Sequence, residues 1–277
     1  MQALGPFSEW ESFKTFNLLS EEAYGFFNKT TRENPHILCD NNYHLFQRFK
    51  YIAENFSYTI RMSTSWCLLL PALSLVRTRL EQTIVCSYLT YEDKKIGLEQ
   101  YLNFHKIESY NTMQRATHDE QMKKNIASVI NTKEAYESAC HSPKNITPEY
   151  LEGDKFSKKW TTLNLESMSK KRDIFSQQKS KIHHQLEHDY RTMYVLLSSV
   201  VHSTPSLLID DFISEFVYKE EIVLMPPPYW MKMAMICCTK YDIIQCYEIL
   251  KFLSLDCDNF YMSLINEWEK EKDKIKI

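Results

Sequence analysis

Two stretches of the sequence carry polar side chains at helical spacing among apolar neighbours. Arg77 and Glu81 lie four residues apart in the first stretch. Tyr194, Ser198 and His202 follow one another in steps of four in the second. Steps of four keep side chains on one face of an α-helix. Because buried charges need partners, we expect the two helices to pack with their polar stripes facing each other.

These residue types could together cleave RNA without a metal ion. His202 would remove the proton from a 2′-hydroxyl, since imidazole titrates near neutral pH. Arg77 would hold the phosphate through its two-pronged guanidinium and stabilise the charge that develops there. Ser198 or Tyr194 would orient the histidine or the substrate, and Glu81 would support Arg77. The alternative is a structural network that fixes the register of the helices and performs no chemistry.

A resemblance to a known family points the same way. The segment Leu73–Glu81, followed by Tyr194-x-x-x-Ser198-x-x-x-His202-Ser203, resembles a bacterial all-helical family catalogued as a domain of unknown function, over about residues 43–213. That group is similar in outline to HEPN domains, many of which are ribonucleases in toxin–antitoxin and phage-defence systems. The resemblance implies an HEPN-like helical bundle and an endoribonuclease.

The sequence departs from the HEPN motif in the spacing of its arginine. In the HEPN motif four to six residues separate an arginine from the histidine that follows it on the same helix. Here Arg191 is the nearest arginine upstream of His202, and ten residues separate the two. The catalytic cation would therefore have to be Arg77, supplied by another helix.

A basic segment at residues 155–181 is the candidate RNA-contact surface. It holds eight lysines and arginines against one glutamate and one aspartate, a local charge of +6. Such a run is typical of a solvated helix face, and it is also the electrostatic pattern of a phosphate-binding surface. The residues expected to contact RNA are Lys158, Lys159, Lys170, Lys171 and Arg172.

Metal and cofactor sites are not expected. The segment from His184 to His188 matches the short inverted zinc-peptidase pattern, with Glu248 as a conceivable third ligand, but two histidines four apart occur easily by chance in a helical chain. Only four glycines occur, and none are clustered. The glycine-rich loops that cradle nucleotide phosphates are therefore absent from the sequence.

The apolar periodicity predicts an all-α fold, a bundle of four to six main helices. We expect an N-terminal helical extension at residues 1–42, a main helical domain at 43–225 and C-terminal helices at 226–277 that pack on it. Within the main domain we expect helices at 43–62 and 65–90, and Pro71 should kink the second of these or mark a restart. The finer prediction is a short helix at 207–217, a short strand at 221–224 and closing helices at 230–253 and 260–268.

Composition limits the setting and the partners. The longest apolar run is too short to span a bilayer, and no secretory signal opens the sequence. The eight cysteines form no C-x-x-C pair, as expected for reduced thiols in the cytosol. The net charge of −3 gives no general attraction to nucleic acid or membrane. The expected partners are RNA, and a second copy of the chain or another protein docking on the apolar helix at 230–253.

Overall fold

A computed structural model of the chain describes most of the helical framework. The described residues are 11–66, 68–91, 98, 101–102, 104, 107–108, 119, 121, 124–125, 151–152, 155–156, 161, 163–180, 184–201, 214–218, 221–225 and 228–275. The backbone alone is described at 41, 151–152, 155–156, 179, 199–201, 214–218, 221–225 and 228.

The predicted all-α bundle is confirmed. The described residues form helices apart from two short antiparallel hairpins, one pairing β1 with β2 and the other β3 with β4. In chain order the elements are α1 (Glu11–Glu33), the 3-10 helix η2 (Pro35–Cys39), α2 (Asn41–Ser65), α3 (Leu69–Tyr91), β1 (Leu151–Glu152), β2 (Lys155–Phe156), α7 (Leu165–Lys179), α8 (Leu186–Asp189), the π-helical turn η6 (Tyr190–Tyr194), α9 (Val195–Val201), β3 (Ser214–Tyr218), β4 (Glu221–Met225), α11 (Pro228–Phe252) and α12 (Asp258–Lys274).

The chain divides into two compact units whose boundaries differ from those predicted at residues 42/43 and 225/226. One unit combines residues 1–91 with residues 165–277, and the other spans residues 92–164. The physical reason is that α1, at one end of the chain, packs against α11 and α12 at the other end. The first helix is therefore part of the core of the first unit and not an extension.

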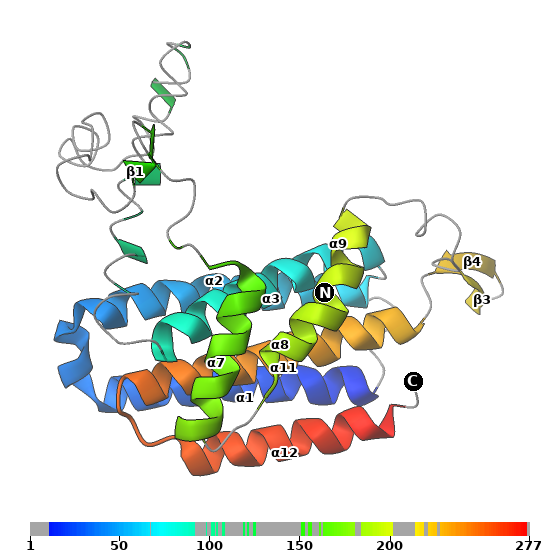
Figure 1. Cartoon of the computed structure of the whole chain (residues 1–277). Helices are drawn as coiled ribbons and strands as arrows, with labels where there is room; N and C mark the ends of the chain where they lie inside the picture. The colour runs from blue at the N-terminus through cyan, green and yellow to red at the C-terminus, as the bar shows by residue number, and fades with distance from the viewer. Residues whose placement is uncertain are drawn as a thin grey trace. The chain divides into compact units, whose positions relative to one another are not determined.

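Helix α11 lies at the centre of this first unit. It packs against α1, α2, α3 and α12, and all residues from Tyr241 to Leu250 are buried (Figure 1). A helix that is apolar all round is stable only when it is covered on every side. The expectation that residues 230–253 offer an outer docking surface is therefore wrong, because the neighbouring helices already cover that apolar surface.

Local sequence signals explain where the other helices begin. The carboxylate of Asp40 accepts a hydrogen bond from the backbone N–H of Asn42 at 2.8 Å and so caps α2. Pro71 lies in the first turn of α3, where its missing N–H costs nothing, so it marks a restart and not a kink. The helix predicted at 207–217 is wrong at its end, because residues from Ser214 onward pair as a hairpin with the predicted strand.

Helix α7 and the continuous α8–η6–α9 segment both pack on α3 (Figure 1). Asp173 of α7 joins the two, since its carboxylate accepts hydrogen bonds from the backbone N–H groups of Leu186 at 3.1 Å and Glu187 at 2.9 Å. These are unpaired donors of the first turn of α8, so the aspartate acts as a cap supplied from another helix. This contact fixes the start of the α8–η6–α9 segment, and therefore the position of its polar residues relative to α3.

Candidate functional site

The structure brings three of the five predicted catalytic residues into contact. On α3, a guanidinium nitrogen of Arg77 lies 3.2 Å from the carboxylate of Glu81, one turn further along. The same nitrogen donates a hydrogen bond of 2.9 Å to the hydroxyl of Tyr194, which comes from η6. The polar stripes of the two helices therefore meet at Arg77.

The aromatic side of this cluster comes from the π-helical turn. The rings of Tyr190 and Tyr194 stack with centroids 4.6 Å apart and planes inclined by 19°. The guanidinium carbon of Arg77 lies 4.9 Å from the Tyr194 ring centroid, within cation–π range. π-helical turns are rare and occur frequently at functional sites. Here the turn supplies both tyrosines that flank the arginine.

The electrostatics of the cluster keep Arg77 charged and the neighbouring tyrosine neutral. The hydrogen bond to Tyr194 is the largest influence that raises the pKa of Arg77, and attraction to Glu81 adds to it. Partial burial, followed by the nearby Tyr194, raises the pKa of Tyr190. At neutral pH the site therefore presents one cation, fixed in orientation, with 18% of its side chain exposed.

The remaining predicted residues are only partly placed. Ser198 lies half-buried on α9, one turn beyond Tyr194. His202 lies outside the described residues, as do Lys158 and Lys159. Lys170 and Lys171 are exposed on α7, as an RNA-contact surface requires.

Arg172 was wrongly predicted to contact RNA. Its side chain is 1% exposed and forms ion pairs with Glu248 of α11 and, at 2.9 Å, with Asp173. It also donates to the backbone carbonyl of His184. Burial alone would lower the pKa of Arg172, but the two carboxylates outweigh burial and raise it. The helix turns this position inward, where it ties α7 to α11.

A second buried network, centred on Asp242 of α11, was missed by the sequence reasoning. One carboxylate oxygen accepts hydrogen bonds from Tyr24 at 2.7 Å, Ser57 at 2.5 Å and Arg79 at 3.2 Å. The other accepts one from Ser20 at 2.9 Å. Since these partners come from α1, α2 and α3, one carboxylate connects all four central helices. Both Asp242 and Arg79 are 0% exposed, so the network is structural and cannot meet a substrate.

A signal for this network was present in the sequence. Asp242, Gln245 and Glu248 recur at steps of three within the apolar helix at 230–253, which places them along one side of it. Arg79 donates to the side chain of Gln245 as well as to Asp242. Polar residues at helical spacing inside an apolar helix indicate partners on the neighbouring helix.

The histidine pair does not form a metal site in the described part of the chain. His188 is exposed on α8, whereas Glu248, the conceivable third ligand, is buried and paired with Arg172. No group of three metal-ligating side chains gathers among the residues that the structure describes. Glu248 is therefore not positioned as a third zinc ligand for the two histidines.

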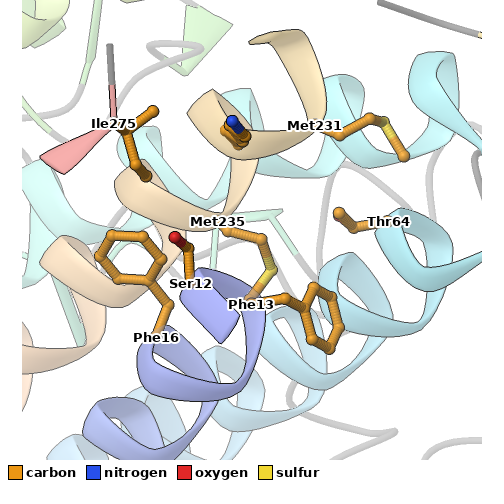
Figure 2. A pocket seen from close by; sticks show the side chains of 8 residues that line it. Ser12, Phe13, Phe16, Thr64, Met231, Met235 and Ile275 are labelled. Atoms are coloured by element: carbon orange, nitrogen blue, oxygen red, sulfur yellow. The ribbon is translucent and has the colours of Figure 1, made fainter. Parts of the chain in front are cut away.

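A small apolar pocket lies where the start of α11 meets the ends of three other segments (Figure 2). Four of its eight lining residues are phenylalanine or methionine, and Lys232 is the one titratable residue among the eight. The lining residues are Ser12, Phe13, Phe16, Thr64, Met231, Lys232, Met235 and Ile275. Acid–base chemistry needs at least a second polar group of suitable pKa, so this pocket is not the candidate active site.

The fold and the cluster define an all-α helical protein with one paired, partly buried arginine on α3. Residues 37–220 match the family of unknown function DUF5677, and because the match covers more than half of the chain, the protein belongs to that family. The matched range includes Arg77, Glu81, Tyr194, Ser198 and His202. Neither a curated protein nor a solved structure matches the chain. Within the described residues, every helix is too short or too polar to cross a membrane.

Proposed function

We propose that this protein is a metal-independent endoribonuclease of the phage-defence or toxin–antitoxin type that works in the cytosol. The observation that carries the proposal is the environment of Arg77. Arg79 and Arg172 are 0% and 1% exposed, and each forms an ion pair with a buried carboxylate. Arg77 instead stays partly accessible, and Glu81 and Tyr194 hold it in place. An oriented surface cation is what binding of a scissile phosphate requires.

In the proposed reaction, His202 takes the proton of a ribose 2′-hydroxyl. The 2′-oxygen then forms a bond to the adjacent phosphorus, and the bond from phosphorus to the 5′-oxygen breaks. The products are a 2′,3′-cyclic phosphate and a 5′-hydroxyl, which receives its proton from the imidazolium. Arg77 stabilises the charge on the non-bridging oxygens, while Ser198 and Tyr194 orient the reacting groups.

Glu81 has a particular part in this proposal. Its carboxylate, 34% exposed, occupies a position on the Arg77 guanidinium that a phosphate could take. RNA binding would then exchange one anion for another on the same cation, with the hydrogen bond to Tyr194 keeping the arginine in place. Lys170 and Lys171, exposed on α7, would add attraction to the backbone, together with Lys158 and Lys159.

The test compares RNA cleavage by the wild type with His202→Ala, Arg77→Ala and Arg77→Lys, each with its melting temperature. We expect losses of at least ~100-fold for the first two, with unchanged melting temperatures. Arg191→Ala is the matched control, because this arginine lies on the same π-helical turn but is 58% exposed and pairs with Glu166 and Glu187. Cleavage that persists in His202→Ala and Arg77→Ala would refute the assignment.

The second candidate is a non-catalytic helical interaction module. The observation that favours it is that Arg77, Glu81 and Tyr194 already satisfy one another, as they would in a network that only fixes the packing of α9 on α3. In that case no RNA substrate would be cleaved by the wild type, and Arg77→Ala would lower the melting temperature.

A further inference from the structure

Exposed apolar side chains are concentrated on α2 and the turn that follows it. The described residues expose twelve large hydrophobic side chains, and six of these fall within twenty consecutive positions. The six are Tyr51, Ile52, Tyr58, Trp66, Leu68 and Leu70, with Tyr51 the most exposed at 66%. Scattered single exposures are normal on a protein surface, whereas a concentration of this kind marks an interaction site.

The residues on α2 form one stripe along the outer side of the helix. At about 100° per residue, Tyr51, Asn55, Tyr58, Met62 and Trp66 all fall within about 80° of one another. Between them, positions such as Ala53 and Ser57 are fully buried against the bundle. The stripe is therefore the solvent face of a helix whose other face already packs in the core.

The area of this surface is in the range that an interface needs. Ile52 lies about 100° from Tyr51 around the helix and so is not part of the stripe. From the exposed fractions and the usual size of the side chains, the other five residues present on the order of 600 Å² of side-chain surface. A standard protein–protein interface buries about 800 Å² on each partner. The largest apolar patch on a typical monomer is about 300–600 Å² and is often functional.

The charges on the stripe argue for a protein partner. RNA binding requires lysine or arginine side chains that reach the phosphates. Between Tyr51 and Trp66 the only basic side chain is Arg61, which is 11% exposed and lies 3.7 Å from the buried Asp242 carboxylate. Apolar and aromatic surface with few charges is the composition of the centre of a protein interface.

We propose that the α2 stripe, from Tyr51 to Trp66, is the docking surface for a second copy of this chain. The large aromatic residues are placed symmetrically along it, with Tyr58 near the middle and Tyr51 and Trp66 at nearly equal distances on either side. A twofold axis between positions 58 and 59 sets two α2 helices antiparallel, so that the same patch on both chains is buried in an isologous contact. This proposal does not depend on the ribonuclease proposal.

In this dimer the N-terminal end of one α2 stripe lies against the C-terminal end of the partner's stripe. Tyr51 faces Trp66 of the partner subunit, Asn55 faces the partner's Met62, and Tyr58 and Thr59 each face their own copies. Leu68 and Leu70 extend the apolar contact beyond the helix end. Aromatic pairs of this kind at a buried centre contribute strongly to association.

The first experiment is sedimentation velocity of the full chain from about 1 to about 100 μM. We expect the wild type to approach twice the mass of one chain, which is 33.0 kDa, as concentration rises. Tyr58→Glu places two like charges opposite each other at the axis and should keep the protein monomeric with its melting temperature unchanged. Leu18→Glu is the matched control, because Leu18 is 57% exposed on α1 and lies outside the stripe. It should dimerise as the wild type does.

The second experiment tests the register by disulfide formation under mild oxidation. Thr59→Cys places two thiols next to the axis and should yield a covalent dimer. Arg48→Cys should yield no more than the wild type, since at 1.5 Å per residue two Arg48 positions lie about 30 Å apart. A wild type that stays monomeric throughout, a Tyr58→Glu variant that still dimerises, or Thr59→Cys cross-linking only as Arg48→Cys does would each overturn the proposal. A monomeric wild type would mean that another protein, or another part of this chain, covers the stripe.

Discussion

Replacing Asp242 with asparagine removes the charge that balances the buried Arg79 while leaving the size of the side chain unchanged. The amide oxygen can still accept the hydrogen bonds of Tyr24, Ser57 and Arg79, which all reach the same carboxylate oxygen. The other oxygen becomes an NH2 group, which cannot accept the hydrogen bond of Ser20. The substitution therefore removes the charge and this one hydrogen bond. Because Arg79 is 0% exposed, water cannot compensate for the lost carboxylate.

The expected cost follows from the burial of both partners. Breaking a buried ion pair by removing one charge costs about 3–5 kcal/mol, and the retained hydrogen bonds place this substitution near 3 kcal/mol. For a chain of this length, that corresponds to a fall in Tm of roughly 6–12 °C. Urea unfolding followed by circular dichroism, with the slope of the transition compared between variants, measures the free energy of unfolding directly.

Two controls separate the buried pair from general effects of the substitution. Asp256→Asn makes the same chemical change at an exposed position between α11 and α12, so its free energy of unfolding should stay within about 0.5 kcal/mol of wild type. Combining Asp242→Leu with Arg79→Met replaces both charges by apolar groups and should cost less than the sum of the two single changes. If Asp242→Asn unfolds within about 0.5 kcal/mol of wild type, the argument that this carboxylate holds the four helices together is refuted.

Three further predictions concern the surface cluster, the thiols and the family range. Glu81→Gln should change the free energy of unfolding by less than about 0.5 kcal/mol, because a partly exposed pair one helical turn apart contributes little. Under the proposed function it should also strengthen RNA binding, measured by fluorescence anisotropy, since it removes the anion that would compete with the phosphate for Arg77. Among the six cysteines that the structure describes, the exposed Cys39 should be alkylated first at neutral pH in the native protein. Cys237 and Cys238 should resist, because burial raises the pKa of each thiol to about 12. Peptide mass spectrometry after timed alkylation checks this order. A fragment limited to residues 37–220 should fail to fold cooperatively in thermal denaturation, since it lacks α11, and a sharp transition at the wild-type temperature would contradict this.

The helical framework was largely predictable because an amphipathic helix shows its inward face in its own sequence. The spacing of apolar residues predicted helices at 43–62 and 65–90, and the structure places α2 at Asn41–Ser65 and α3 at Leu69–Tyr91. The sequence shows which face of a helix points inward, but it shows less clearly which other helix packs against that face. The apolar residues of α11 are spread around the whole helix and mark no single inward face. Its apolar character was therefore interpreted as an outer docking surface, although the same character follows from complete burial.

At the candidate site, too, the sequence did not show which side chains face the core and which face solvent. Arg77 and Arg79 are two positions apart and have similar neighbours in the sequence, so the sequence does not indicate which of the two lies at the surface. The difference is decided by rotation, since two residues turn a helix by about 200°. Arg79 faces Asp242 in the core, and Arg77 faces Tyr194 at the edge. Arg172 was misassigned for the same reason. A run of basic residues on a helix includes some that face solvent and some that face the core, and the run itself does not distinguish them.

Helix α3 therefore connects the core to the candidate site through its two opposite faces. On the inner face Asp242 fixes the position of α3 relative to α1, α2 and α11, and on the outer face the same helix presents Arg77 to η6. If the protein cleaves RNA as proposed, we expect a loosened inner contact to shift the outer one, and a displacement of about 1 Å could lower the rate about 100-fold. Loss of RNA cleavage in an Asp242 variant is therefore no sign of a catalytic role for that carboxylate. Only variants that lose activity while keeping the wild-type Tm, as expected for Arg77→Ala, identify residues that act on the substrate.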